Sequence, residues 1–292
     1  MPVPVVFGAL ALVWGASFLF MKLAVIGLSP AQVALGRIIL GALTLAAIMA
    51  FTRRHWPRER ALWLHMVVVA IFFCVAPFLL FAWAAEQLPS GLSAILNATT
   101  PLWTTLVAVV ALRGERMTLW RAVGVLIGAV GVAVVIGIGD VLTSAEFAAS
   151  LPAQLACLGA TASYGIALGW MRRFVTGRYR HDPVTLAATQ MAVAGVIALL
   201  LVPFIALTPV APDVASVLSL LALGCLGTGV VYVWNMRVIA AWGAVGASTV
   251  TYVIPVVGVA LGILVLGESF ALHELVGALI VVGGVVLVQW KR

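Results

Sequence analysis

The stretches NATTPLWTTLVAVVALRGE (residues 97–115) and VTYVIPVVGVALGILVLGE (residues 250–268) decide the fold, because they are two copies of one pattern. Each is an apolar run that contains a proline and ends in Gly-Glu. A further glycine follows nine residues beyond each glutamate. The corresponding landmarks are Pro101 and Pro255, Glu115 and Glu268, and Gly124 and Gly277.

The correspondence extends upstream of these stretches. Ser29-Pro30 and Asp182-Pro183 each open an apolar run, and seven residues beyond the prolines stand Arg37 and Gln190. The two members of each corresponding pair are 153 or 154 residues apart. A constant offset of this kind indicates an internal duplication. We therefore predict two repeats, residues 1–140 and residues 150–292.

The chain contains ten apolar segments of roughly 20 residues, the length that a helix needs to cross the core of a bilayer. The segments are 4–26, 31–51, 62–85, 91–111, 119–137, 152–171, 184–207, 214–236, 244–266 and 271–290. Only 9% of the residues are charged, against about 25% in soluble domains. We predict an all-α polytopic membrane protein with ten transmembrane helices.

The basic residues lie on one side of this predicted topology. With the N-terminus inside, the inner loops and the C-terminal tail hold fourteen of the sixteen Lys and Arg residues, and the outer loops hold none. This asymmetry predicts a bacterial-type inner (plasma) membrane protein with both termini in the cytoplasm. The net charge of +7 then reflects topology and contacts with membrane lipids, and it does not indicate nucleic-acid binding.

Five spans in each repeat turn the second repeat upside down relative to the first. The loop at Gly114-Glu115 is then inside and basic, whereas the loop at Gly267-Glu268 is outside and acidic. Inverted repeats are typical of alternating-access transporters, whose binding site lies near the bilayer midplane between the two halves.

Trp14-Gly15, Arg37 and the two Pro…Gly-Glu…Gly arrangements resemble those of the drug/metabolite transporter superfamily, in its ten-helix EamA branch. The resemblance covers essentially the whole chain and implies two five-helix repeats and a transport function. The aromatic residues considered next also make the chain similar to aromatic amino-acid exporters of the YddG type within that superfamily.

Polar and aromatic side chains recur at helical spacing in several spans, and such stripes avoid lipid because an unmet hydrogen bond there is costly. Asn97, Tyr232, Asn235 and Tyr252 lie on such stripes, as do Trp14 and Tyr164. The competing interpretation is hydrogen bonding or packing between helices. Our candidate substrate-binding residues are Trp14, Phe78, Asn97, Trp103, Tyr164, Tyr232, Asn235 and Tyr252.

Arg37 is the most costly residue of the predicted spans, since an arginine there costs roughly 2.5–3.5 kcal/mol on insertion scales. It is either a carboxylate clamp or a residue of gating or structural function, and we favour the second. Gln190, its counterpart, keeps hydrogen bonding without charge. Lys22 lies nearer the outer end of its span and is expected to snorkel. Glu115 and Glu268 are expected to favour the N-terminus of the helix that follows each of them.

Prolines and glycines inside spans are candidate hinges, because they weaken helical hydrogen bonding. These candidates are Pro77, Pro101, Gly224, Gly227 and Pro255, with tight packing as the alternative for the glycines. Gly124 and Gly128 in the fifth span, and Gly277 in the tenth, predict close contact between these two spans or a dimer contact. We favour a monomer, because ten helices already supply both halves of a cavity.

The sequence favours a carrier over an enzyme or a channel. The spans contain no paired acids, metal-binding cluster or nucleophile with a base, so we expect no catalysis, metal or cofactor. A passive channel would favour rings of charged groups or carbonyls. We predict a secondary transporter that exports small amphipathic metabolites, amino acids and above all aromatic ones, by alternating access. A multidrug or cation exporter is the alternative. No Asp or Glu lies in the middle of a predicted span, which weakens the case for proton coupling.

Overall fold

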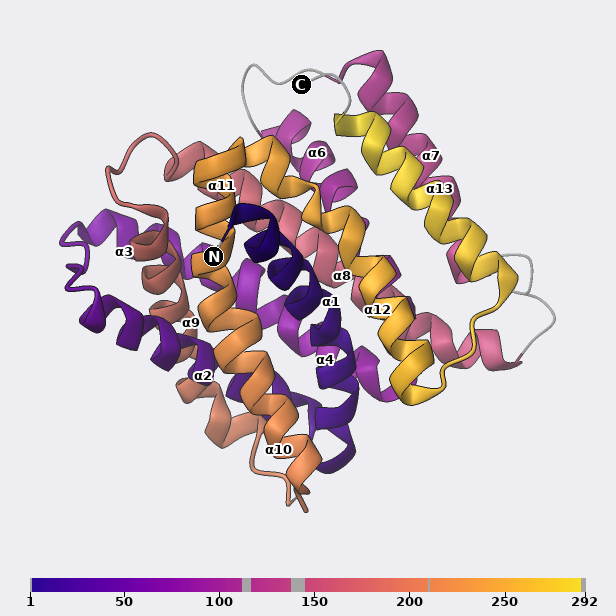
Figure 1. The fold of residues 1–292 in the computed structure, drawn as a ribbon, viewed down its shortest axis with the longest axis horizontal. Helices are drawn as coiled ribbons and strands as arrows, with labels where there is room; N and C mark the ends of the chain where they lie inside the picture. Colours follow the sequence, from indigo (N-terminus) through magenta and orange to yellow (C-terminus); the bar gives the residue numbers. More distant parts are fainter. Residues whose placement is uncertain (1, 112–116, 138–144, 210, 290–292) are drawn as a thin grey trace.

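The computed structural model describes residues 2–111, 117–137, 145–209 and 211–289, and throughout these ranges the regular structure is helical (Figure 1). Two elements, η1 and η3, are π-helical and interrupt longer helices. The elements are α1 (Val3–Gly27), α2 (Pro30–Phe51), α3 (Arg60–Ala70), η1 (Ile71–Val75), α4 (Ala76–Gln87), α5 (Ser90–Asn97), α6 (Thr100–Ala111), α7 (Leu119–Ile136), α8 (Ala145–Phe174), α9 (Pro183–Ile205), α10 (Val214–Leu221), η3 (Ala222–Val230), α11 (Val231–Ser248), α12 (Val250–Leu266) and α13 (Leu272–Gln289).

Ten apolar helical stretches account for the predicted spans. In the described ranges, nine are long and apolar enough to cross a membrane, and α12 is a shorter apolar helix. The prediction of an all-α polytopic fold in two inverted five-helix repeats is therefore confirmed. One boundary differs: residues 237–243, expected as a loop, are helical, and α11 continues to Ser248. No proline interrupts this alanine-rich stretch, and alanine favours helix.

The duplication is visible in the irregularities of the helices. A shift of 153 residues places η1 (Ile71–Val75) on residues 224–228, inside η3. The fourth span of each repeat is also divided: α5 ends at Asn97 before α6, and α11 ends at Ser248 before α12. The second span begins alike in both repeats, because Ser29 and Asp182 each accept hydrogen bonds from the first turn of a helix that starts with proline.

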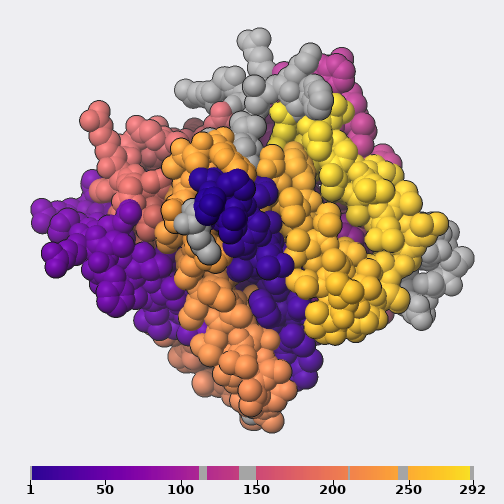
Figure 2. All heavy atoms as spheres, viewed as in Figure 1, coloured from indigo at the N-terminus to yellow at the C-terminus, as the bar shows by residue number. Residues whose placement is uncertain are grey.

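The two repeats interlock through their first helices. In Figure 2, the N-terminal part of α1 lies between α11 and α12 of the second repeat, and α1 contacts both. The corresponding helix of the second repeat, α8, packs against α4, α5 and α6 of the first. Each repeat therefore surrounds the first helix of the other, which brings side chains of both to the centre of the molecule.

The last helices of the two repeats, α7 and α13, lie side by side at one edge of the molecule (Figure 1). Glycines allow their backbones to approach closely: a Cβ added at Gly131 would lie 2.6 Å from the Val281 nitrogen, and one added at Gly277 would lie 2.6 Å from the Val135 nitrogen. The predicted contact between the fifth and tenth spans is confirmed.

Two charged side chains have partners that the sequence did not identify. Glu268 accepts hydrogen bonds from the backbone N–H of Ser90 (2.6 Å) and of Gly91 (3.2 Å), so it caps α5 of the other repeat and not the helix that follows it. Lys22 Nζ reaches the end of a neighbouring span, where it donates to the carbonyls of Ala85 (2.8 Å) and Leu88 (3.0 Å) at the C-terminus of α4, so its snorkelling stays a prediction. In both cases a helix terminus brought close by tertiary packing offers unsatisfied backbone groups.

Candidate functional site

A cavity of about 280 Å³ lies between the two repeats. Seven aromatic side chains dominate its wall, which also contains two amides, three hydroxyls and one arginine, and no Asp or Glu of the described chain lines it. The first four spans of the first repeat contribute, as do the first, third and fourth of the second. The lining residues are Trp14, Ser17, Phe18, Met21, Arg37, Phe73, Phe78, Phe81, Asn97, Thr100, Tyr164, Leu168, Gly227, Tyr232, Asn235, Thr251 and Ile254.

The irregular parts of the helices converge on this cavity. Asn97 ends α5 and Thr100 begins α6, and both line it. The hydroxyl of Thr100 donates to the Asn97 carbonyl at 2.8 Å, so the break is stabilised locally. Phe73 of η1 and Gly227 of η3 also face the cavity. Interrupted helices at the repeat interface are typical of transporter binding sites, and π-helical turns are frequent at functional sites.

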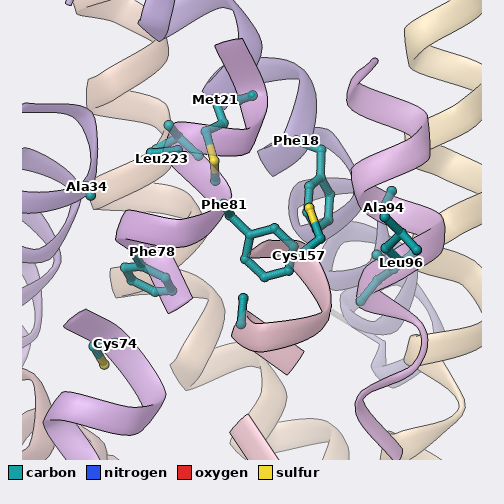
Figure 3. Packing of buried hydrophobic residues seen from close by; sticks show 14 of the residues in the cluster. Phe18, Met21, Ala34, Cys74, Phe78, Phe81, Ala94, Leu96, Cys157 and Leu223 are labelled. Atoms are coloured by element: carbon teal, nitrogen blue, oxygen red, sulfur yellow. The ribbon is translucent and has the colours of Figure 1, made fainter. Parts of the chain in front are cut away.

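The aromatic side chains form a connected group along one wall. The ring centroids of Phe18 and Phe81 are 5.6 Å apart in an edge-to-face arrangement, and those of Phe81 and Tyr164 are 6.3 Å apart and stacked. Phe73 continues the group, 5.1 Å from Tyr164. Figure 3 shows Phe78 and Phe81 on α4, with Phe18 facing Phe81. Such a wall can hold an apolar ring through stacking and edge contacts.

Arg37 is held against this wall by contacts with both repeats. Its guanidinium carbon lies 4.0 Å from the ring centroid of Phe78, and its Nε donates to Thr228 Oγ1 at 2.9 Å. The Thr228 hydroxyl in turn donates to the Leu223 carbonyl at 3.0 Å, which leaves its oxygen to accept from Arg37. Among the described residues, no carboxylate pairs with Arg37, although a buried cation in a membrane span is usually paired.

Six of the eight predicted substrate-binding residues lie together around the cavity, where they join Arg37 and Gly227. Their role in binding stays a prediction, and so does the gating or structural role of Arg37. The six are Trp14, Phe78, Asn97, Tyr164, Tyr232 and Asn235.

Trp103 and Tyr252 are not among the residues that line the cavity. The hydroxyl of Tyr252 donates to Gln289 Oε1 at 2.8 Å, so this side chain reaches toward α13. Its neighbour Thr251 faces the cavity instead, because one residue corresponds to a rotation of about 100° around the helix. Trp103 lies against α8, where its backbone and Cβ approach Gly165.

The remaining predicted positions lie around the cavity rather than in it. Gln190 is buried, and its Nε2 donates to the sulfur of Cys74 at 3.3 Å. Pro77 and Pro101 each occupy the second position of a helix, directly after η1 and after the break that follows α5. At Pro101 a proline costs no hydrogen bond, because α6 begins there after a break. Pro77 lies inside the longer helix that runs through η1 into α4, where it removes one backbone donor. Pro255 lies within α12.

The two candidate hinge glycines in η3 pack closely against the first repeat. A Cβ at Gly224 would lie 3.2 Å from the Arg37 carbonyl oxygen, and a Cβ at Gly227 would lie 3.0 Å from Ser17 Oγ. Close packing therefore accounts for Gly224, whose added Cβ would also lie 2.4 Å from Leu40 Cβ. At Gly227, by contrast, a small shift of the Ser17 hydroxyl would make room. A hinge role for them, and for the prolines, stays a prediction.

Phe73 and Ile254 line the cavity but were not anticipated. Phe73 precedes Phe78 by five residues, a spacing that a regular helix would place on different faces. Because η1 has the wider π-helical turn, the two side chains reach the same cavity. A search for side chains spaced three or four residues apart therefore does not identify Phe73 as a cavity residue.

Ion pairs connect the two repeats at one end of the molecule. This end carries residues 52–59 and 175–182 and is called the basic end below. Arg54 pairs with Asp182, and His181 Nε2 lies 3.0 Å from Glu59 Oε2. Partial burial acts to raise the pKa of Asp182. Hydrogen bonds from Thr185 and the charge of Arg54 outweigh this effect and hold the pKa below its ordinary value. Hydrogen bonds from its own backbone and from His181 likewise lower the pKa of Glu59.

Comparison with known proteins identifies relatives over nearly the whole chain. The model of the EamA-like transporter family matches residues 4–137 and 151–290, one match in each repeat. The uncharacterized transporter YoaV of Bacillus subtilis is 24% identical over 279 residues, which cover 95% of this chain and 93% of that protein. The uncharacterized transporter YvbV of the same organism is 26% identical, over 97% of this chain and 90% of that protein.

A solved structure shows the same fold. This crystal structure of a protein superposes with a TM-score of 0.63 and covers 97% of this chain and 99% of that chain. Sequence identity is 17%, so the likeness concerns the fold alone.

Proposed function

Because this chain belongs to the EamA-like transporter family, we propose that it is a secondary transporter that exports small amphipathic metabolites, amino acids and above all aromatic ones. The observation that carries this proposal is the cavity between the repeats, whose wall combines seven aromatic rings with amides and hydroxyls. A few convergent polar groups in an aromatic pocket suit a solute that has both a ring and polar groups.

The size of the cavity supports a metabolite over a drug-sized molecule. Its volume of about 280 Å³ is near the lower end of the roughly 300–1,000 Å³ that is usual for small-molecule pockets. A single amino acid is a solute of suitable size.

The charges around the cavity weigh against a lipophilic cation. Aromatic faces can attract cations, but no carboxylate of the described chain lines this wall, and Arg37 contributes a positive charge to it. The absence of Asp and Glu from this lining also favours facilitated export or exchange over a proton relay through a cavity carboxylate.

Alternating access would arise from relative movement of the two repeats around the cavity. Among the described helices, the backbone departs from regular α-helix in η1, in η3 and at the breaks in the fourth spans, and all of these border the cavity. We place the protein in a bacterial-type inner (plasma) membrane, with both termini in the cytoplasm, because the basic residues lie in the predicted inner loops. We expect a monomer.

Efflux from sealed liposomes tests this function. Purified protein is reconstituted, the vesicles are loaded with tritiated phenylalanine, threonine or a lipophilic cation, and release is timed with and without a pH gradient. Saturable release of phenylalanine, faster than in protein-free vesicles, supports the proposal, and its response to the gradient reports the coupling. Release of the cation alone would favour multidrug export and contradict the amino-acid assignment.

A further inference from the structure

We propose that Arg37 binds a carboxylate group of the transported solute, so that the cavity selects acids over the corresponding amides. This inference deepens the proposed function and rests on it for the identity of the site. It also assigns Arg37 a role in recognition, beyond the structural or gating role that the sequence favours.

The first observation is the free part of the guanidinium. Nε of Arg37 donates to Thr228, but the structure gives its terminal nitrogens no hydrogen-bond partner among the described residues. Neither terminal nitrogen is fully sealed from solvent, although the residue as a whole is only 8% exposed. Because Arg37 lines the cavity, the accessible surface of its terminal nitrogens belongs to the cavity.

The second observation is that the guanidinium is fixed in orientation. Phe78 covers the group at 4.0 Å from the ring centroid, and Thr228 accepts from Nε at 2.9 Å. The two terminal NH2 groups therefore form a rigid pair of donors, the geometry in which arginine binds both oxygens of a carboxylate. A lysine could not present such a pair.

The third observation concerns the charge balance. In the described part of the chain, no Asp or Glu lines the cavity, so no protein carboxylate competes for Arg37. A buried arginine in a membrane span normally has an anionic or carbonyl partner. A solute carboxylate supplies the missing partner, and the aromatic wall supplies contacts for the remainder of the same solute.

Thr228 is a positioning residue in this arrangement. It lies in η3 of the second repeat, whereas Arg37 lies in α2 of the first. Its hydroxyl orients the guanidinium without itself lining the cavity. Because the Arg37–Thr228 contact joins the repeats, a solute held by Arg37 is sensitive to their relative position.

The test is direct binding to the purified full-length protein in lipid nanodiscs, measured by calorimetry with two matched pairs of compounds. The pairs are phenylalanine with phenylalaninamide, and 3-phenylpropanoate with 3-phenylpropanamide. We expect each acid to bind about 10- to 100-fold more tightly than its amide, the range that corresponds to one charge-assisted hydrogen-bonded pair.

Variants assign this preference to the residue. Arg37→Gln should abolish the acid preference, Arg37→Lys should retain part of it, and Thr228→Val should lower the ratio of acid affinity to amide affinity without abolishing it. Arg58→Gln, which removes an exposed arginine outside the spans, is the matched control and should keep the full preference. Equal affinity for acid and amide in the wild type, no binding of either acid, or an unchanged preference in Arg37→Gln would each overturn the proposal.

The outcome separates this inference from the proposed function. If the acid preference depends on Arg37 but phenylalanine is not released from liposomes, the carboxylate site stands and the assigned solute is wrong. If phenylalanine is released but acids and amides bind alike, transport stands and the role of Arg37 is wrong.

Discussion

Arg37 and Gln190 occupy corresponding positions in the two repeats, and each donates a hydrogen bond to the third span of the opposite repeat. Arg37 Nε reaches Thr228 Oγ1 at 2.9 Å, and Gln190 Nε2 reaches the sulfur of Cys74 at 3.3 Å. The geometry is repeated, but the chemistry is not, because only Arg37 carries a charge and lines the cavity. The duplication thus provides two equivalent contacts, one of which is available to a solute.

The tyrosines of the cavity region allow a matched comparison. Tyr232→Ala should reduce the initial rate of phenylalanine efflux about tenfold or more, because stacking of an aromatic pair contributes roughly 0.5–1.5 kcal/mol beyond the area that it buries. Tyr252→Ala makes the same chemical change outside the cavity, where the hydroxyl donates to Gln289. It should retain efflux when rates are normalised to the folded protein in the vesicles. Equal losses in both variants would remove Tyr232 from the site.

Asn97 offers a second test, because it lies where α5 ends and lines the cavity. Asn97→Ala removes an amide that can orient a polar solute, but leaves the backbone carbonyl that accepts from Thr100. We expect a severalfold increase in the half-saturating concentration for phenylalanine efflux and unchanged thermal stability. Full activity would indicate that the amide has no role in binding.

Glu268 should contribute more to stability than the neighbouring Glu274. Glu268 accepts from two backbone N–H groups of α5 in the other repeat, and loss of a helix cap costs about 0.5–2 kcal/mol. Glu274 caps only its own helix, through the exposed N–H of Ala271. Thermal unfolding in detergent should show a clearly larger decrease in Tm for Glu268→Ala than for Glu274→Ala. The reverse order would contradict a role of Glu268 in joining the repeats.

Stability should fall in acid because of the contacts at the basic end. The pKa values of Asp182 and Glu59 are lowered in the folded protein, from ordinary values of 3.8 and 4.5. Their contribution is therefore complete above those values and is lost as the pH falls through the lower folded-state values. We expect the Tm of the wild type to decrease below about pH 4.5, and that of Asp182→Asn to decrease less steeply. Parallel pH profiles would show that these carboxylates do not contribute.

Much of the fold could be predicted from the sequence, because the span lengths and the 153-residue offset are local or additive signals. The partners of Lys22 and Glu268 could not, since both bind termini of helices that are distant along the chain. The end of α11 was also predicted wrongly, because hydropathy does not distinguish a helical turn from a short loop.

The cavity was predicted in part for a related reason. Regular helical spacing places Trp14 and Tyr164 on polar faces, and both line the cavity. It could not distinguish Tyr252 from Thr251 on adjacent faces of one helix, and it did not identify Phe73, which reaches the cavity together with Phe78 because η1 is π-helical. Departures from regular helix are determined by packing between the repeats, and the sequence pattern of one span does not contain this information.

Adjacent glycines of α13 provide a sharp test of how the two repeats join at their last helices. A Cβ at Gly284 would lie 2.5 Å from the Gly128 nitrogen and 2.7 Å from the Gly124 oxygen, whereas a Cβ at Gly283 would meet nothing within 4 Å. Gly284→Ala must therefore push α7 and α13 apart, and overpacking of this kind typically costs about 1–3 kcal/mol. Gly283→Ala should be neutral or slightly stabilising, because alanine favours helix over glycine by up to about 1 kcal/mol. Thermal unfolding of the two variants should separate them clearly. Equal Tm values would mean that the two helices do not pack through these glycines, and that the contact between α7 and α13 is looser than the structure shows.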